Sequence, residues 1–245
     1  MRETIEVAPN VSDLRVINQA ADAWLPWNAI GVEERLAVLD QWSALLKLQQ
    51  GIDLLVSQVI EYHCQQAAKL IAEPLNMPGP TGESNILSTS GRGVFLIMAE
   101  ENSSVIAFSA LLSCALVAGN SVIVSDTVEH KALFDVLQQA CDLSAVAMPV
   151  CFVKDNQALE NLLDDDVVAG VGYVGDEQKV IELNRVIAAR TGQIATFITE
   201  TDLLQLETSR DQNLVLRFIT EKTLSTNVTA VGGNATLLAL GCGDE

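Results

Sequence analysis

The sequence of 245 residues has little histidine, few basic residues and no long apolar run. Its two histidines, His63 and His130, lie in no cluster of candidate ligands, so a zinc site is not expected. The 14 lysines and arginines face 32 aspartates and glutamates, a formal net charge of -18. Such a field repels phosphate backbones and anionic lipid headgroups. The composition therefore disfavours nucleic-acid binding and direct membrane contact by this chain.

Membrane-spanning and secretory signals are also missing. The longest apolar run, residues 105–118, contains Ser109, Ser113 and Cys114 and is too short to cross a bilayer. The first ten residues carry charges of both signs and no apolar signal region. Five scattered cysteines share no close paired spacing, which is typical of reduced thiols and predicts a cytosolic protein.

The first seventy residues are predicted to be helical. A helix is expected over residues 12–23, before Leu25-Pro26-Trp27 interrupts the pattern. Apolar residues recur at spacings of three and four over residues 32–48, and a further amphipathic helix follows over residues 52–70. The segment NMPGPTGESN, residues 76–85, is rich in proline and glycine. It is predicted to be a loop and the best internal boundary.

Beyond this loop, short apolar runs alternate with helical patterns. The expected strands cover residues 93–98, 121–124, 145–153, 167–173 and 194–199. The expected helices cover residues 103–117, 129–141, 157–163, 177–190 and 211–222. Parallel neighbours need a long crossover, and strands that are apolar on both faces need helices on both sides. The sequence therefore predicts an α/β fold with a doubly wound, Rossmann-like parallel sheet.

Two acidic segments differ from known ligand-binding motifs. Residues 99–104, which follow the first expected strand, contain two carboxylates and no glycine, so a dinucleotide fingerprint is absent. Asn102 or Ser103 is instead expected to cap the next helix. The aspartate triplet at residues 164–166 is interpreted as a solvated loop, because no second cluster of ligands has suitable spacing. No metal site is expected.

The glycine-rich segment at residues 170–176 leaves two interpretations open. It ends an expected strand, where an open α/β sheet binds ligands, and Gly172 and Gly175 would let a cofactor phosphate approach the backbone. Glycine-rich strand ends are also ordinary turns before a helix. The turn is the commoner of the two, and the two glycines are kept as weak cofactor candidates.

Several of these stretches resemble the cofactor domain of aldehyde dehydrogenases. In that family a strand leads to an asparagine-bearing loop, an apolar helix and a Gly-Asn pair, as in GVFLIMAEENSSVIAFSALLSCALVAGNSVIVSDT. VAGVGYVGDEQ resembles the family's Phe-Thr-Gly-Ser turn, and IATFITETD resembles the strand that carries its general-base glutamate. The resemblance implies a Rossmann-like fold of the aldehyde dehydrogenase type.

The resemblance also carries over site residues, with departures that imply an inactive domain. Asn102 matches the asparagine that assists the oxyanion, and Glu200 matches the general base, so both are vestigial matches. Where the family has a Lys-Pro that holds the cofactor ribose, this chain has Ser125 and Asp126. Asp202 replaces the glycine that follows the glutamate. No catalytic residue is therefore expected to act in this chain.

The catalytic cysteine domain of the family has no counterpart in this sequence. That domain is much longer than the stretch of about forty residues that follows the glutamate strand here. Cys242 lies at the end of this stretch, so it cannot occupy a cysteine loop held by such a domain. Thiohemiacetal chemistry needs a thiolate beside the nicotinamide, an oxyanion donor and a base. No cofactor is expected on this domain, although the resemblance implies FAD and NAD in the parent enzyme.

Two longer motifs, PGPTGESNILSTSGRGV and LSTNVTAVGGNATLLALG, resemble the C-terminal region of the proline utilisation A (PutA) family. That family joins a proline dehydrogenase to a pyrroline-5-carboxylate dehydrogenase. Its longer members carry an extra aldehyde-dehydrogenase-like domain and a terminal motif. The implied organisation is a helical segment (1–78), a Rossmann-like domain (79–205), and a terminal helix with a β-hairpin flap (206–245). The resemblance implies a cytoplasmic location. It leaves open whether the parent enzyme is a peripheral protein of the inner membrane.

The terminal motif is predicted to be a β-hairpin. Gly232-Gly233-Asn234 tolerates the positive φ of a tight turn, and no helix follows it to form a phosphate cradle. A lone hairpin is marginal, and its open edge is a liability unless a partner covers it. The expected partners are the catalytic domains of the same polypeptide or a second copy in a homodimer. The flap residues expected to make this contact are Leu224, Asn227, Val228, Gly232, Gly233, Asn234, Leu237 and Leu238.

Two kinds of function remain open. One is a noncatalytic domain in the proline-to-glutamate route, acting as a lid over the passage that carries pyrroline-5-carboxylate and as an interdomain or oligomer contact. The other is a fragment of an NAD-dependent pyrroline-5-carboxylate dehydrogenase, or an NAD-binding regulatory module. Asn102 and Glu200 favour the dehydrogenase, and the glycines of residues 170–176 favour the regulatory module. The missing cysteine domain favours the noncatalytic domain.

Overall fold

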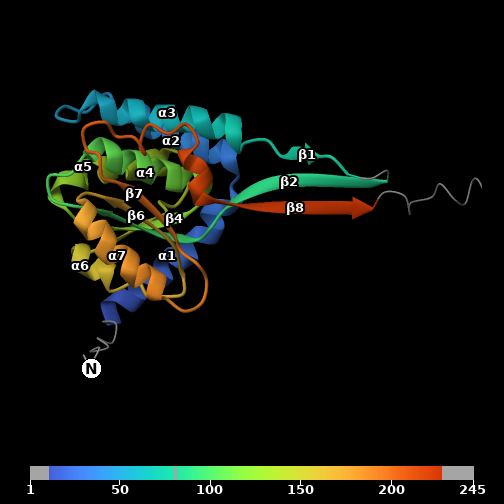
Figure 1. Cartoon of the computed structure of the whole chain (residues 1–245). Coiled ribbons are helices and arrows are strands. Elements are labelled where there is room, and N and C mark those ends of the chain that lie inside the picture. The colour runs from blue at the N-terminus through green and yellow to red at the C-terminus, as the bar shows by residue number, and fades with distance from the viewer. Residues whose placement is uncertain (1–10, 80–81, 228–245) are drawn as a thin grey trace, which may run out of the picture.

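The computed structural model describes residues 11–79 and 82–227 (Figure 1). Its centre is a parallel five-stranded sheet in the order β5-β4-β3-β6-β7. The strands are β3 (Val94–Ala99), β4 (Ser121–Ser125), β5 (Val150–Val153), β6 (Val168–Val174) and β7 (Thr196–Glu200). Helices cover both faces, so the predicted doubly wound α/β fold is confirmed.

The two faces of the sheet belong to two hydrophobic clusters. On one side lie α2 (Val32–Leu46), α3 (Leu54–Leu70), α4 (Val105–Ala118) and α5 (Val128–Leu143). On the other side lie α1 (Val11–Ala29), α6 (Asn156–Glu160) and α7 (Glu177–Ala189). Successive strand residues alternate between the clusters, so Phe95 and Ile97 enter the first, and Leu96 and Met98 enter the second. The strands are therefore apolar on both faces, as the sequence pattern requires.

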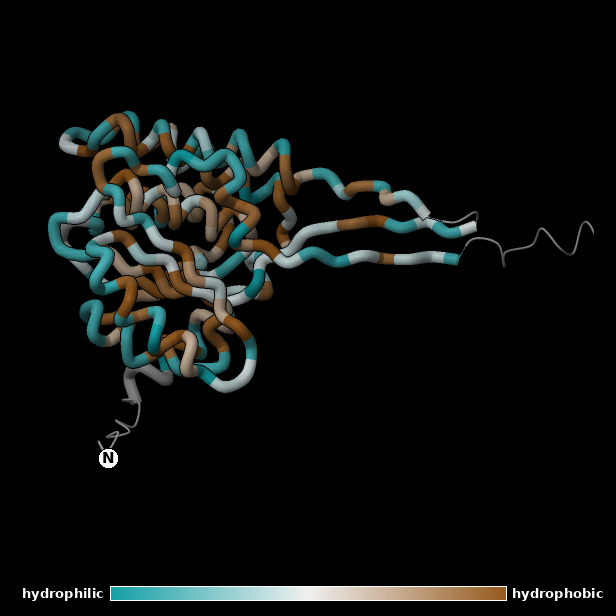
Figure 2. Tube along the Cα trace, in the orientation of Figure 1, coloured by the Kyte–Doolittle hydropathy of each residue, from teal (hydrophilic) through white to brown (hydrophobic). Residues whose placement is uncertain are grey.

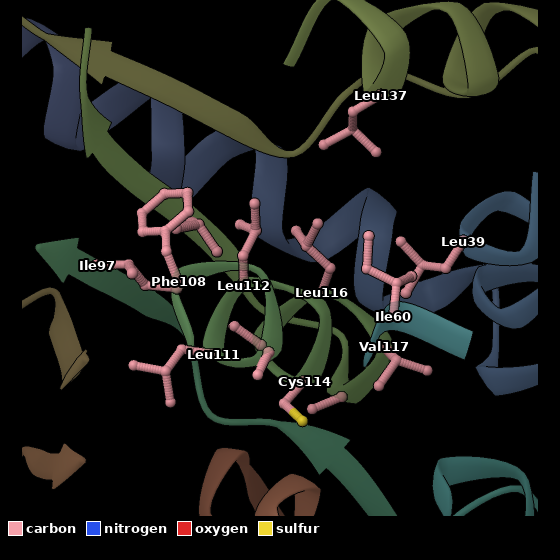
Figure 3. Packing of buried hydrophobic residues seen from close by; sticks show 14 of the residues in the cluster. Leu39, Ile60, Ile97, Phe108, Leu111, Leu112, Cys114, Leu116, Val117 and Leu137 are labelled. Carbon is pink, nitrogen blue, oxygen red and sulfur yellow. The ribbon is translucent and has the colours of Figure 1, made fainter. Parts of the chain in front are cut away.

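Helix α4 is apolar on all sides because it is buried on all sides. Residues 107–118 are all buried, between the sheet and the helices α2 and α3. Figure 3 shows Phe108, Leu111 and Leu116 of this helix among the side chains of the neighbouring elements. Gly119 ends the helix with a φ of 98°, a left-handed conformation that glycine adopts without steric cost.

Helix α1 continues through Pro26, where the sequence pattern predicted a break. Proline inside a helix removes a hydrogen bond and costs about 3 kcal/mol or more. Tertiary contacts hold the last turn in place: the indole N–H of Trp27 donates to the Leu116 carbonyl at 2.8 Å. The buried guanidinium of Arg35 donates to the Val117 carbonyl at 2.9 Å, where the negative end of α4 stabilises it. Burial lowers the pKa of Arg35 to about 10.

A second sheet projects from this body as an arm (Figure 1). It is antiparallel, in the order β1-β2-β8, with β1 (Leu75–Met77), β2 (Glu83–Gly91) and β8 (Ile219–Asn227). Strands β2 and β8 pair along their whole length, from Gly91 opposite Ile219 at the base to Glu83 opposite Asn227 at the tip. Figure 2 shows hydrophilic and hydrophobic residues mixed along the arm, in contrast to the sheet in the body.

Two predictions about this region are wrong. The segment at residues 76–85 is not a plain loop, because it contains the ends of two strands of a β1–β2 hairpin. The helix predicted over residues 211–222 is replaced by a short 3-10 helix, Leu214–Phe218, and the first part of β8. Strand β2 is rich in serine and threonine and shows no clean alternation. Its structure depends on pairing with β8, a partner that is remote in the sequence.

Candidate functional site

The carboxyl ends of β3, β6 and β7 meet at one edge of the sheet. The chain passes from β3 to β4 and β5 on one side and then returns to β6 on the other, so the topological switch point lies between β3 and β6. Asn102 follows β3, Gly175 follows β6 and Glu200 ends β7. The Gly175 N–H donates to the Glu200 carbonyl at 3.1 Å. The fold thus brings these three predicted positions to the edge where such sheets bind ligands.

Asn102 lies in an exposed loop with a φ of 62°, a left-handed conformation that asparagine tolerates. It does not cap α4, and neither does Ser103. The capping residue is Ser104, whose hydroxyl oxygen accepts the Ala107 N–H at 3.2 Å. The predicted cap is therefore wrong by one or two residues, because the chain makes a turn at Asn102 before it enters the helix.

Glu200 is a buried carboxylate, with 2% of its surface exposed. Its Oε2 atom accepts the backbone N–H of Ser209 at 2.8 Å and the Ser209 hydroxyl at 2.9 Å. The Ser209 carbonyl in turn lies 2.9 Å from Nε2 of His63 on α3. A general base needs a carboxylate within reach of a substrate proton. Glu200 instead holds the segment after β7 against the body through its hydrogen bonds with Ser209. The sequence analysis missed Ser209 as its partner.

Asp202 stands where the resemblance places a glycine, and it shapes the same segment. Its Oδ1 atom accepts the N–H groups of Leu204 and Gln205 at 3.1 and 2.9 Å. Its carbonyl accepts the Leu206 N–H at 2.8 Å. A glycine has no side chain to accept the first two bonds. The aspartate at position 202 therefore stabilises a turn that a glycine there would not.

The N-terminus of α7 already holds carboxylates of the chain itself. Asp176 caps the helix by accepting the Gln178 N–H at 2.5 Å, and its own N–H donates to Oε2 of Glu100 at 3.0 Å. A Cβ added to Gly175, whose φ is 156°, would lie 2.7 Å from the same Glu100 oxygen. Burial, together with Glu100, raises the pKa of the Tyr173 phenol well above its usual range. Dinucleotide pyrophosphates bind at such helix ends, and these two carboxylates oppose one.

Gly172, the other weak cofactor candidate, lies inside β6 rather than at its end. A Cβ added there would lie 3.4 Å from side-chain atoms of Ile97 and Leu111, which is ordinary van der Waals contact. At Gly170 an added Cβ would lie 2.2 Å from the Phe95 ring. Gly170 therefore makes room for the Phe95 ring, Gly172 lies within the packed strand, and Gly175 follows the strand at the carboxyl edge.

A cavity of about 560 Å³ opens at the carboxyl ends of β3, β4 and β5. Its charged wall residues are Glu100, Glu101, Lys154 and Asp155. Ser125, which replaces the family's lysine, donates to Oδ1 of Asn156 at 2.9 Å, and Asn156 donates to the last carbonyl of β3 at 2.7 Å. Ser125 therefore ties β4 to its neighbours and is not free to hold a ribose. With three carboxylates to one ammonium, the charge of the wall opposes the phosphates of a nicotinamide dinucleotide.

No metal centre is formed within residues 11–79 and 82–227, where no group of three or more His, Cys, Asp and Glu side chains is placed to hold an ion. In the acidic triplet, Oδ1 of Asp165 accepts the Val167 N–H at 2.9 Å and shapes the turn into β6. None of the helices among these residues is long and apolar enough to cross a bilayer.

The predicted flap lies only partly within the described residues. Leu224 lies opposite Ile86 in the arm, and Asn227 lies opposite Glu83. The remaining flap residues, Val228, Gly232, Gly233, Asn234, Leu237 and Leu238, lie outside the described residues, so the hairpin predicted there stays a prediction. The sequence analysis missed strands β1 and β2. Among the described residues, β8 is the outer strand of the sheet that they form.

The arm carries apolar side chains that the body does not cover. Leu75, Met77 and Leu224 are exposed by 54%, 43% and 64%. Over the part of the chain that the structure describes, β1 and β8 are the edge strands of their sheet. Exposed edges with apolar side chains are sites at which another strand adds to a sheet.

No family model matches the chain. The bifunctional protein PutA of Salmonella typhimurium is 29% identical over 209 residues, which make up 84% of this chain and 14% of that protein. The PutA protein of Escherichia coli K12 is 28% identical over 67% of this chain and 11% of that protein. The chain thus spans about a seventh or less of the length of the curated relatives it matches.

Solved structures show the same likeness. A crystal structure of a Bradyrhizobium japonicum PutA mutant has a TM-score of 0.67 and 26% identity, and the match covers 80% of this chain and 22% of that one. The NADP-dependent glyceraldehyde-3-phosphate dehydrogenase of Bacillus halodurans has a TM-score of 0.63 and 18% identity over 78% of this chain and 44% of that one, which shows the fold alone. This chain is therefore homologous to part of the bifunctional PutA proteins and has the fold of the aldehyde dehydrogenases.

Proposed function

We propose that this chain is a noncatalytic, aldehyde-dehydrogenase-like domain of a PutA-type enzyme, which converts proline to glutamate through pyrroline-5-carboxylate. The domain docks through its arm and covers the passage between the two active sites. Its partners are the catalytic domains of the same polypeptide, and the flap also offers a homodimer contact. The observation that carries this proposal is the projecting β1-β2-β8 sheet, in which β1 and β8 are the outer strands among the described residues and apolar side chains are exposed.

The carboxyl edge of the body supports the noncatalytic part of the proposal. Glu200 is buried, and its Oε2 atom already accepts two hydrogen bonds from Ser209, so the carboxylate is not placed to accept a proton from a substrate. Glu100 lies on the helix end at which a pyrophosphate would bind. In this view the cofactors FAD and NAD belong to the catalytic domains and not to this one, and the enzyme acts in the cytoplasm.

The shape of the arm supports the docking part of the proposal. A small sheet of this kind gains little from its own side chains, because seven of the nine residues of β8 are exposed. Addition of a partner strand to the arm would pair with backbone groups of an outer strand and cover part of the exposed Leu224 side chain. A covered passage would then keep pyrroline-5-carboxylate from leaving between the two reactions.

Calorimetric titration of the 245-residue chain with NAD tests the noncatalytic part. We expect no binding, and no NADH production on addition of pyrroline-5-carboxylate. A catalytically active aldehyde dehydrogenase serves as the positive control. Micromolar binding of NAD, or aldehyde-dependent NADH, would overturn this part of the proposal.

Deletion of residues 224–240 from a PutA polypeptide that carries this domain tests the docking part. We expect a longer lag before NADH appears from proline, because the intermediate escapes, and unchanged rates of the two separate reactions. If the lag time and the oligomer size both stay as in the intact enzyme, the arm is not a lid contact.

The volume of the cavity at the carboxyl edge, about 560 Å³, favours a second function, an NAD-binding regulatory module or dehydrogenase fragment, whereas the charge of the cavity wall opposes the phosphates of NAD. Its size suits a small ligand. The NAD titration and the NADH assay together separate the three possibilities: the regulatory module binds NAD without turnover, the dehydrogenase fragment turns over, and the noncatalytic domain does neither.

A further inference from the structure

The arm joins the body beside one buried asparagine. Asn120 lies between α4 and β4, with 0% of its surface exposed. The strands β2 and β8, which pair along their whole length, both meet the body next to it (Figure 1). A buried amide needs partners for its donors and acceptors, so the hydrogen bonds of Asn120 show which parts of the chain it holds together.

The side chain of Asn120 binds the base of both strands at once. Its Oδ1 atom accepts the N–H groups of Arg92 and Gly93, which follow β2, at 2.6 and 3.0 Å. Its Nδ2 atom donates to the carbonyl of Phe218, which precedes β8, at 2.9 Å. The same atom donates to the Ala115 carbonyl in the last turn of α4 at 3.0 Å. The lone pairs and the N–H groups of the amide are therefore all in use.

A second asparagine holds β2 from the side of α1. Oδ1 of Asn28 accepts the Gly91 N–H at 2.9 Å, and its Nδ2 atom donates to the Ser90 hydroxyl at 3.0 Å. Arg92 donates from Nη1 to the carbonyl of Ile219, the first residue of β8, at 3.1 Å. The base of the arm is thus bonded to α1, to α4 and across its own two strands.

The backbones of the arm and the body also come very close at this point. A Cβ added to Gly91, the last residue of β2, would lie 2.3 Å from the carbonyl oxygen of Gly119 and 2.9 Å from the backbone nitrogen of Asn120. Backbone atoms cannot turn aside as the end of a flexible side chain can. The missing side chain therefore lets β2 pass directly against the end of α4, where a tilt of the arm would break the contact.

We propose that Asn120 and Asn28 are positioning residues, which fix the direction in which the arm leaves the body. An arm with a fixed direction meets its partner preorganised, because it has little orientational freedom to lose on docking. The consequence for docking rests on the proposed function, whereas the fixed direction is a property of the free chain.

The distance between two spin labels, measured by pulsed electron paramagnetic resonance, tests the fixed direction in the 245-residue chain. The labels replace the exposed residues Thr226 in β8 and Arg185 in α7 and are attached through p-acetylphenylalanine, because the chain has cysteines of its own. We expect one narrow distribution of distances. Asn120→Ala and Asn28→Ala should broaden it, and Gly91→Ala should shift its mean, since the added Cβ displaces β2.

Asn156→Ala is the matched control. Asn156 also joins strands through its amide, which donates to the last carbonyl of β3 at 2.7 Å, but it does so within the body. This variant should lower the melting temperature and leave the width of the distribution unchanged. If Asn120→Ala does not fold, Asn28→Ala, at a half-buried side chain, still tests the proposal. An unchanged width in every folded variant of Asn120 and Asn28 would overturn it, and so would equal broadening by Asn156→Ala.

The consequence for docking is measured separately, in a PutA polypeptide that carries this domain. Asn28→Ala should lower the yield of chemical crosslinks between the arm and the catalytic domains, whereas Asn156→Ala should not. A broadened distribution with an unchanged crosslink yield would support the fixed direction and count against docking through the arm. A narrow distribution in Asn28→Ala and Asn120→Ala would overturn the positioning role, whatever the crosslink yield.

Discussion

The body and the arm are both built on β-sheets, but they differ in what surrounds the strands. Every residue of β3 in the body is buried, and its neighbours on both faces are apolar. In β8 of the arm only the first residue is buried and the last seven are exposed. Packing therefore stabilises the body, whereas the arm is held by backbone pairing along β2 and β8. The body thus buries its apolar strands within itself, whereas the arm leaves apolar side chains exposed that a partner would cover.

This contrast predicts that the largest losses of stability come from α4. Phe108→Ala should lower the free energy of unfolding by about 3–5 kcal/mol, because the ring is buried and stacks on His130 with centroids 4.1 Å apart. Urea denaturation followed by circular dichroism measures the change. A loss below about 1 kcal/mol would mean that the body tolerates a cavity at its centre.

A smaller loss of stability is expected when the hydrogen bonds between Glu200 and the segment after β7 are removed. Glu200→Ala removes the acceptor of two Ser209 donors and should cost about 1–3 kcal/mol by the same measurement. Glu207→Ala, an exposed glutamate in that segment, is the matched control and should change the free energy of unfolding by about 0.5 kcal/mol or less. Equal effects of the two variants would contradict a structural role for Glu200.

The pH dependence of stability tests the same region. Burial lowers the pKa of His63 from 6.5, against the smaller opposing effects of the Ser209 carbonyl and the Asp211 carboxylate. The unfolded chain therefore binds a proton more readily, and the stabilisation present above pH 6.5 is lost as the pH falls below this value. The slope due to this group is at most about 1.4 kcal/mol per pH unit. It should be absent from His63→Gln, and an unchanged slope in that variant would assign the effect to other groups.

The smallest effect on stability is expected in the arm. Leu224→Lys should change the free energy of unfolding by about 0.5 kcal/mol or less, because the side chain is 64% exposed. It should nevertheless weaken docking, since a charged edge discourages strand addition. Val186→Lys on α7, at a side chain that is 48% exposed, is the matched control. Chemical crosslinking to the catalytic domains distinguishes them, and equal crosslinking of both variants would contradict docking through the arm.

Much of the body could be predicted from the sequence. The alternation of apolar runs and helical patterns placed the five parallel strands and the helices between them, because each element carries its burial pattern locally. Asn102, Gly175 and Glu200 were correctly expected near strand ends. What Glu200 contacts could not be predicted, since Ser209 reaches it through a turn that Asp202 makes.

The sequence by itself determined the alternating fold, the acidic surface and the absence of a glycine-rich cofactor loop after β3. Only the tertiary structure decided the course of the chain through Pro26, the replacement of the predicted helix by β8, and the pairing of β8 with β2. The physical reason is the range of the interactions. Apolar periodicity is a local property, whereas strand pairing and the bonds of Trp27 and Arg35 join residues far apart in the chain.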